Sequence, residues 1–237
     1  DHVGERTVSP AVTLPYRLAG NGSTLLDHHH NECGLRLTPA EAARALIARQ
    51  QFSVGGIQPF PESIFGLKSA KTAVAAGRPL AWVDSGNLAD TLAANQRPGP
   101  IGTFHHSWPT GVRPGQDMPQ GGQADALTWQ SRSMLLIPDS DGYVTGVSIA
   151  EGVRYGDGTD PNLVPHTTYT QKKKSEPYTP RDVHISRPGW RQLLTAYADA
   201  VAPGVLAADL PPDTRIRVTG LASYQEHSAG PVVEAMP

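Results

Sequence analysis

Apolar residues recur at helical spacing from about residue 42, and the residues just before them are suited to begin a helix. Thr38 suits an N-cap, Pro39 the first helical turn, and Glu41 the position that reaches back to close a capping box. We therefore predict a helix from Pro39 to about residue 51, with Arg44 and Arg49 turned toward solvent or a partner. The buried stripe of this helix is predicted to contain Ala42, Ala43, Leu46 and Ile47.

The rest of the pattern consists of short elements separated by turns. Further helices are predicted at residues 88–95 and 188–201, and strands at residues 80–83, 134–137, 143–149, 215–221 and 231–233. The second and third strands form a hairpin across Asp139–Gly142, since Asp and Gly tolerate a tight reversal. The last two form another hairpin, with its tip at residues 224–228.

The order of these elements predicts an α+β fold. It is expected to be a mixed, irregular domain with short antiparallel hairpins, a few helices and long loops rich in Gly and Pro. Residues 97–123 are the clearest such loop, because they contain many Gly and Pro residues and show no usable periodicity. With 237 residues and 38% hydrophobic content, the chain is long enough to bury a core of ordinary size.

Charge is patterned along the chain, although the formal net charge is only -2. Residues 36–78 hold six basic and two acidic residues, and residues 172–191 hold the same numbers. Between them, residues 132–160 hold two basic and five acidic residues. Local basic patches of this kind can attract a phosphate backbone without a basic isoelectric point.

Cys33 is the single cysteine, so no disulfide within the chain is expected, and a reducing, cytoplasmic location is the simplest interpretation. No apolar run approaches the length that a membrane span needs, so no membrane partner is predicted. The chain begins at Asp1 without an initiator Met and ends just after an apolar pair, Val232 and Val233. We therefore expect it to be a piece of a longer protein.

Two constellations suggest chemistry. The histidines at 28–30 with Cys33, and the pair at 105–106, are typical zinc ligands, but adjacent histidines cannot all reach one ion and no paired chelate spacing is present. A hydrolase that uses Asp27 with His28 or His30 is a second possibility, although the chain has no nucleophile elbow and no glycine-rich phosphate loop. We predict no catalytic residue, no metal site and no cofactor.

Three further features each have a plain and a functional interpretation. Gly55 and Gly56 either stop the preceding helix or allow the backbone to approach a ligand closely. Lys172, Lys173 and Lys174 are either a solvated run or a phosphate contact. Gln225 lies at the predicted tip of a hairpin, and its plain interpretation is an exposed polar side chain.

Several stretches together resemble the CasA family, the large subunit of the type I-E CRISPR Cascade surveillance complex. The most specific is Ala124–Arg132, followed by the predicted hairpin through Tyr143–Val147. Other stretches match in order and spacing, namely Leu37–Leu46 with Phe52–Ile57, Thr91–Asn95, and the segment from Pro180 to Arg191. The similarity covers most of the chain.

The resemblance implies a non-enzymatic subunit that recognises the protospacer-adjacent motif from the minor groove of target double-stranded DNA and promotes strand separation and R-loop formation. Its implied partners are the other Cascade subunits, crRNA, the target duplex and a recruited helicase-nuclease. Gly55 and Gly56 match the family's glycine loop, and Gln225 matches the wedge that enters the duplex. Residues 26–33 fall where the family has a loop near the 5' end of the crRNA.

The chain departs from the family pattern in three respects. The family's lysine finger falls near residues 149–154, where this chain has no Lys, and Arg154 is predicted to replace it. Cys33 stands alone, so the zinc site of some family members is expected to be absent. Residues 1–237 are expected to form one N-terminal large domain without its first segment and without the C-terminal four-helix bundle. A scaffold subunit without DNA contact remains a further alternative.

Overall fold

The computed structural model describes residues 9–10, 18–19, 22–23, 34–57, 69–70, 72–97, 99–104, 115–118, 121–155, 164, 166–171, 173–176, 178–181, 210–211, 213–224 and 227–236. Within these residues the helices are α1 (Pro39–Phe52), α2 (Leu88–Ala94) and α3 (Gln123–Leu127). The longer strands are β5 (Leu80–Asp84), β7 (Arg132–Pro138), β8 (Val144–Glu151), β12 (Arg215–Tyr224) and β13 (His227–Met236). Two-residue strands are β1 (Leu18–Ala19), β2 (Gly22–Ser23), β3 (Gly56–Ile57), β4 (Ser69–Ala70), β6 (Asp117–Met118), β9 (Arg154–Tyr155), β10 (Tyr169–Thr170) and β11 (Thr179–Pro180).

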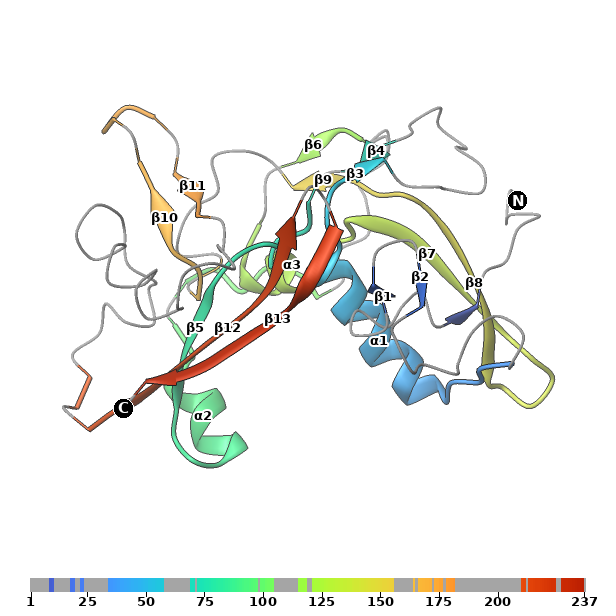
Figure 1. The fold of residues 1–237 in the computed structure, drawn as a ribbon, viewed down its shortest axis with the longest axis horizontal. Helices are drawn as coiled ribbons and strands as arrows, with labels where there is room; N and C mark the ends of the chain where they lie inside the picture. The colour runs from blue at the N-terminus through green and yellow to red at the C-terminus, as the bar shows by residue number, and fades with distance from the viewer. Residues whose placement is uncertain are drawn as a thin grey trace.

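The strands form several small sheets, almost all antiparallel, so the predicted α+β class with short antiparallel hairpins is confirmed (Figure 1). The hairpin β7–β8 lies beside α1, and the three-stranded sheet β13–β12–β5 lies on the other side of the molecule with α2 at its end. The pair β6–β9 is parallel. No helix in the described part of the chain is long and apolar enough to cross a membrane.

Helix α1 begins as its sequence predicts. The side chain of Thr38 accepts a hydrogen bond from the Glu41 N–H at 3.3 Å, and Glu41 Oε2 accepts one from the Thr38 N–H at 2.9 Å. This capping box satisfies two backbone donors that a helix start leaves without partners. The predicted buried stripe is only partly right: Ala42 is buried, Leu46 and Ile47 are half-buried, and Ala43 is exposed. Ala45, which was not predicted, is buried instead.

The hairpin β7–β8 covers the buried face of α1. Val144 and Leu37 exchange backbone hydrogen bonds of 2.8 and 3.0 Å, which place the hairpin against the start of the helix. Their side chains form one apolar cluster with Ala42, Ala45 and Val147. Ala43 lies about 100° around the helix from Ala42, so it falls outside this contact.

The turn of this hairpin is the predicted one. Asp139 Oδ1 accepts the N–H groups of Asp141 and Tyr143 at 2.9 and 3.0 Å. Arg36 adds a brace from outside, with ion pairs of 2.7 Å to Asp139 and 2.8 Å to Asp141, and it lies over the Tyr143 ring. The paired acidic residues therefore have a structural role in a turn.

The outer edge of β5 is closed by side chains and a short segment. Asn95, just after α2, accepts a hydrogen bond from the Val83 N–H at 2.9 Å and donates one to the Val83 carbonyl at 2.7 Å. Two residues along the strand, Ala81 donates to the His166 carbonyl at 2.7 Å. The other edge of β5 pairs with β12, so both edges of the strand have partners.

Another apolar cluster brings together residues that are far apart in the sequence. It contains Val74, Ala126, Trp129, Val153, Val164 and Tyr169. The indole N–H of Trp129 donates to the Val153 carbonyl at 2.9 Å, which satisfies the polar atom of this buried ring.

The predicted loop at residues 97–123 is partly ordered by contacts that sequence periodicity does not signal. It contains β6, and the five-residue helix α3 begins at its end, at Gln123. Both elements are too short to produce a periodic pattern. The predicted helix at residues 188–201 lies outside the described residues.

Candidate nucleic-acid interface

The pair Gly55 and Gly56 does not terminate α1. The helix ends at Phe52, and its C-cap residue, Ser53, is extended at φ -71° and ψ 123°. Gly55 is not among the described glycines with a positive φ, so backbone strain does not explain the glycine. Of the two interpretations of this pair, the structure contradicts the helix stop and leaves close backbone approach untested.

The glycine pair is held in place from both sides. Gly55 is buried, and its N–H donates to Thr72 Oγ1 at 3.1 Å. Gly56 begins β3 and pairs with Ala70 of β4. The Gly55 donor is therefore already used, and the buried backbone at this residue is fixed within the protein.

The end of α1 is fastened to the start of β7 by one buried side chain, Gln50. Its Nε2 donates to the Arg132 carbonyl at 2.6 Å, and its Oε1 accepts the Arg132 N–H at 2.9 Å. Its own carbonyl accepts the hydroxyl of Ser131 at 2.8 Å. The Gln50 side chain therefore pairs with the backbone of Arg132 as a neighbouring strand would, and we call these two hydrogen bonds the Gln50 rung.

Arg132 connects this rung to the glycine pair. Its side chain is buried, with Nη2 donating to the Val54 carbonyl at 2.9 Å and Nη1 to the Ser131 carbonyl at 2.7 Å. Burial, and secondarily the charge of Arg49, lower the pKa of Arg132 to about 9. A charged guanidinium therefore holds the residue directly before Gly55.

Arg49 corrects one prediction from the sequence. Burial lowers the pKa of its guanidinium to about 10, so it does not lie free in solvent. By contrast, Arg44 is exposed on the same helix, as predicted. The signal was present in the sequence, since Arg49 follows Ala42 by two helical turns and therefore lies on the buried face.

Arg154 lies close in the chain to a residue that packs on the backbone at the start of β7, where Gln50 and Arg132 pair. It lies in β9, and its N–H donates to the Gln116 carbonyl at 2.9 Å. Two residues earlier, Gly152 packs so closely on the backbone of residues 130–132 that no Cβ would fit. The side chain of Arg154 is half-buried, and its Nε is closed off from solvent without a hydrogen-bond partner. Its predicted DNA contact is not tested.

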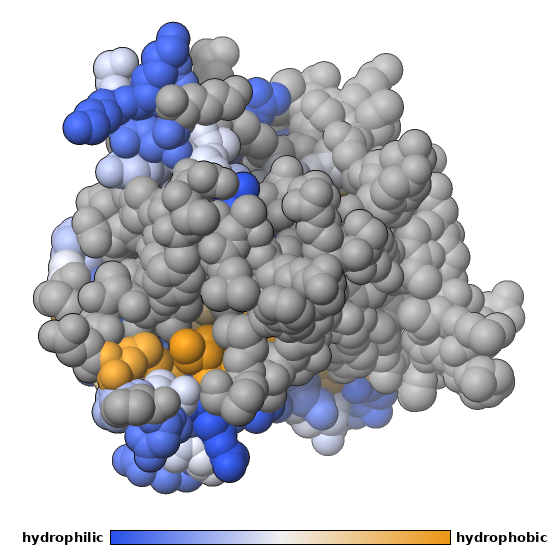
Figure 2. Space-filling view, turned by 60° about the vertical axis from the view of Figure 1, so that its left-hand side comes forward, coloured by the Kyte–Doolittle hydropathy of each residue, from blue (hydrophilic) through white to orange (hydrophobic). Residues whose placement is uncertain are grey.

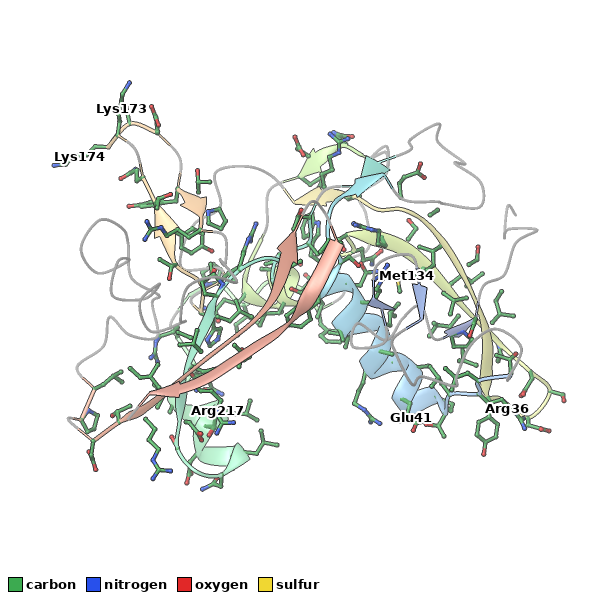
Figure 3. All side chains as sticks on the ribbon, viewed as in Figure 1. Arg36, Glu41, Met134, Lys173, Lys174 and Arg217 are labelled. Atoms are coloured by element: carbon green, nitrogen blue, oxygen red, sulfur yellow. The ribbon has the colours of Figure 1, made fainter. Side chains whose placement is uncertain are left out.

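The described lysines of the predicted run lie on a separate projection. Lys173 and Lys174 are exposed in the turn between β10 and β11 and point away from the body of the protein (Figure 3). Figure 2 shows this projection as a hydrophilic knob at the top of the molecule. Gln171 stabilises the turn by donating to the carbonyls of Lys174 and Glu176 at 3.2 and 2.8 Å. Lys172 lies outside the described residues.

The hairpin β12–β13 confirms a strand pair longer than the predicted one. Its two strands carry ten residues each, with an irregularity in register between Ala222 and Ser223. The ends next to residues 225–226 point to the same side of the view as β3 and β9, away from α2 (Figure 1). Gln225 itself lies outside the described residues, so its contact stays a prediction.

The metal and hydrolase hypotheses rest on residues that the structure does not describe. Asp27, the histidines at 28–30, Cys33 and the histidines at 105–106 all fall in that group. Among the described residues, no group of three His, Cys, Asp or Glu side chains could hold a metal ion.

Comparison with solved structures identifies a fold found in CRISPR-associated proteins. A crystal structure of a CRISPR-associated protein from Thermus thermophilus matches with a TM-score of 0.73 at 22% identity, over 100% of this chain and 50% of that one. Cse1 from Acidimicrobium ferrooxidans matches with a TM-score of 0.68 at 19% identity, over 99% of this chain and 49% of that one. A chain of a structure described as a CRISPR RNA-guided surveillance complex, pre-nicking, matches with a TM-score of 0.71 at 21% identity, over 99% of this chain and 50% of that one. These likenesses show a shared fold.

Sequence comparison specifies the family. The family model for CRISPR-associated protein Cse1 matches residues 12–233. The CRISPR-associated protein CasA/Cse1 of Thermus thermophilus is 31% identical over 163 residues, which are 65% of this chain and 30% of that protein. The chain belongs to the CRISPR-associated Cse1 family. It spans about half the length of the solved relatives that it matches.

Proposed function

We propose that this chain is the DNA-reading part of the large subunit of a type I-E Cascade complex. In that role it recognises the protospacer-adjacent motif in target double-stranded DNA and promotes strand separation and R-loop formation. Its partners are the other Cascade subunits and crRNA, the target duplex and a recruited helicase-nuclease. Family membership and the fold shared with a chain of a surveillance complex support this assignment.

The observation that carries the proposal is the setting of the glycine pair. Gly55 does not cap the helix, does not adopt a left-handed conformation, and yet is fixed by Thr72 and by the Arg132 contact to Val54. A rigid stretch of backbone without side chains is what a close approach to a duplex edge requires. Contacts of this kind act without chemistry, which agrees with the predicted absence of catalytic residues.

The energetic demand on such a contact is small. Replacing a DNA duplex by an RNA–DNA duplex is a nearly balanced exchange, so a few kcal/mol of contact free energy can decide whether the guide begins to pair. Gln225 at the wedge position and Arg154 at the lysine-finger position would add to the contact of Gly55 and Gly56. Lys172, Lys173 and Lys174 would add a longer-range attraction for phosphates.

The test is target binding by the complex that contains this chain, at stated salt, on duplexes with a matched or a mutated motif. The variant Gly55→Val/Gly56→Val is expected to lose discrimination between the two duplexes, and Gln225→Ala to reduce strand opening on the matched one. Gly142→Asn, in an exposed turn at φ 83°, is the glycine control. Wild-type affinity in the double valine variant would instead support a scaffold subunit without DNA contact.

Hydrolysis tests the remaining alternative. Nuclease or esterase activity that is present in the purified chain and lost in His28→Ala would favour a hydrolase and contradict the proposal.

A further inference from the structure

The sheet β13–β12–β5 has a polar face that the proposed function does not use. Its other face packs on an apolar cluster that includes Ala81 and Val218, which lie opposite each other in the register. Successive side chains of a strand point to opposite faces of a sheet, so the register pairs one and three residues further along lie on the polar face. At the end of the sheet next to α2, these pairs are Trp82 with Arg217 and Asp84 with Arg215 (Figure 1).

Two arginines share one carboxylate on this face. Arg217 Nη2 forms an ion pair of 2.5 Å with Asp84 Oδ2. A hydrogen bond from the Gly86 N–H, the bond from Arg217 and the charges of Arg217 and Arg215 lower the pKa of Asp84 below its ordinary value. Arg215 forms no hydrogen bond and no ion pair with any residue that the structure describes. Within this group of side chains, one positive charge is therefore left over.

The charged side chains of the polar face are in contact with solvent. Arg215 is exposed, and the side chain of Arg217 is 48% exposed. Figure 3 shows Arg217 at the same end of the view as α2. Trp82 is half-buried, whereas Leu80, the next residue of β5 on this face, is only 6% exposed. The accessible part of the face is therefore its end near Arg215.

His166 holds the ring of Trp82 from the outer edge of β5. The two ring centroids are 5.4 Å apart with an angle of 49° between the planes, which is a favourable aromatic contact. His166 Nδ1 donates to the Ala81 carbonyl at 3.1 Å, because a carbonyl can only accept. Burial is the main cause that lowers the pKa of His166 below its ordinary value, so the ring is neutral at neutral pH. It therefore orients Trp82 without adding charge.

An aromatic ring beside surplus arginine charge matches the chemistry of single-stranded nucleic acid. An unpaired base offers a flat surface that stacks on an indole ring, and its phosphates are attracted by guanidinium groups. The strand β12, which carries both arginines, also leads to the hairpin end at which the target duplex is proposed to open. From Arg215 to Tyr224 it spans about 30 Å, at roughly 3.3 Å per residue. A DNA strand released at that end therefore has a path along β12 to the arginines.

We propose that Trp82, Arg215 and Arg217 bind a single strand of DNA, with a base on the Trp82 ring and a phosphate group on Arg215. The proposal rests on the proposed function and names a further contact of the parted target. Arg217 keeps the Asp84 carboxylate paired, so that its charge does not repel the phosphate. His166 is a positioning residue, because it acts through the Trp82 ring.

The first test measures the salt dependence of binding between the purified chain and a thymidine oligonucleotide of about 12 nucleotides, a length within the usual range of single-strand sites. Arg215→Gln is expected to lower the slope of log K against log salt concentration by about 0.7, because one phosphate contact is lost. Arg44→Gln is the matched control, since it removes an exposed charge of the same sign from α1. An unchanged slope in Arg215→Gln, or an equal fall in both variants, would overturn the proposal.

The second test concerns the stacked base. Trp82→Leu is expected to weaken oligonucleotide binding at least about fivefold, whereas Trp82→Tyr retains a ring and should bind more tightly than the leucine variant. The oligonucleotide is expected to quench tryptophan fluorescence in the wild type and to lose most of this effect in Trp82→Leu, although the other tryptophans of the chain remain. Equal quenching in both proteins would contradict stacking on Trp82. Melting temperatures show that the variants are folded, and Arg215→Gln, at an exposed position, tests the site even where Trp82→Leu does not fold.

Three further outcomes would assign the face to another ligand. A blunt DNA duplex of the same length that binds and quenches as the single strand does would exclude base stacking, since its bases are paired. Binding of a uridine oligonucleotide without binding of the thymidine one would assign the face to RNA. Failure of both oligonucleotides to bind, with impaired assembly of the complex in Trp82→Leu, would assign it to a protein partner. Each of these results would overturn the proposal.

The two proposals fail in different ways. If Gly55→Val/Gly56→Val loses motif discrimination while Arg215→Gln and Trp82→Leu bind the oligonucleotide as the wild type does, the single-strand site is wrong and the proposed function stands. If the double valine variant discriminates as the wild type does while oligonucleotide binding depends on Arg215 and Trp82, the proposed function is wrong and the single-strand site stands.

Discussion

Two of the places where this chain is proposed to meet DNA are built in opposite ways. Around Gly55, polar side chains are buried and each is fixed: Gln50, Ser131 and Arg132 are at most 8% exposed and bond one another or the loop. Around Lys173 and Lys174, the charged groups are exposed, and the ion pair between Lys173 and Glu176 is 3.8 Å long.

The difference teaches what each place can contribute to recognition. A group that is already fixed loses little conformational entropy on binding, so its contacts can discriminate between sequences or shapes. A solvated lysine contributes a charge that attracts any phosphate and weakens with salt. We therefore expect the region around Gly55 to provide specificity and the lysine projection to provide affinity. We also expect substitutions around Gly55 to lower the free energy of unfolding far more than substitutions in the lysine projection.

The largest loss of stability is expected for Gly152→Ala. An added Cβ would overlap the backbone of residues 130–132, which cannot move without breaking the Gln50 rung. We expect a loss of about 4 kcal/mol in the free energy of unfolding, measured by urea denaturation. Gly142→Ala is the control, because no atom lies within 4 Å of its Cβ and only its φ of 83° is unfavourable. Equal losses in the two variants would mean that the close backbone approach is not important.

Gln50→Ala is expected to have the next largest effect. It leaves the N–H and carbonyl of Arg132 without their partners in a buried place. We expect a loss of about 2–3 kcal/mol, since each unsatisfied buried polar group costs roughly 1–3 kcal/mol. Gln96→Ala, at an exposed position, should change the same denaturation midpoint little. If Gln50→Ala leaves the free energy of unfolding unchanged, the region around Gly55 is not rigid, and the contrast between this region and the lysine projection is wrong.

Arg49→Gln is expected to change stability in the opposite direction. Its pKa in the folded protein, about 10, is below its ordinary value, so between these values the unfolded state binds more protons and stability rises with pH. At neutral pH the buried charge therefore costs free energy, and removing it is expected to stabilise the chain by about 1 kcal/mol. This advantage should shrink as the pH rises above about 10 toward the ordinary pKa of arginine, measured by thermal unfolding of both proteins. A destabilised variant with no pH trend would contradict an unpaired guanidinium.

The smallest effect on the fold is expected for Lys173→Gln/Lys174→Gln. Both side chains are exposed, so the free energy of unfolding should change by less than about 0.5 kcal/mol. Duplex affinity should fall for matched and mutated motifs alike, with a lower salt slope, in a binding titration over a range of salt concentrations. A selective loss on the matched motif would mean that the lysine projection also discriminates.

The sequence predicted those parts of the fold that depend on neighbouring residues. The capping box of Thr38 and Glu41 and the Asp139 turn were predicted because each requires only residues a few positions apart. The hairpin strands followed from short runs of β-forming residues next to such a turn. Helix α2 was predicted for the same local reasons.

Contacts between distant parts of the chain were not predictable in this way. Gln50 and Arg132 are 82 positions apart, and neither a lone Gln in a helix nor an Arg at a strand start indicates such a pairing. Arg49 was predicted to face solvent or a partner because its charge outweighed its position on the helical face, and the structure shows it half-buried. The glycine pair was singled out from the sequence, but its fixed setting depends on Thr72 and Arg132, which periodicity does not relate to it.

The closed edge of β5 has a consequence for association between copies of the chain. An asparagine side-chain amide offers both donor and acceptor groups, as a peptide group does, but it does not continue into another extended residue. Asn95 therefore completes the outer edge at Val83 without offering a new ladder to a neighbouring molecule. On that side the sheet cannot grow by strand addition, which protects the protein from edge-to-edge aggregation.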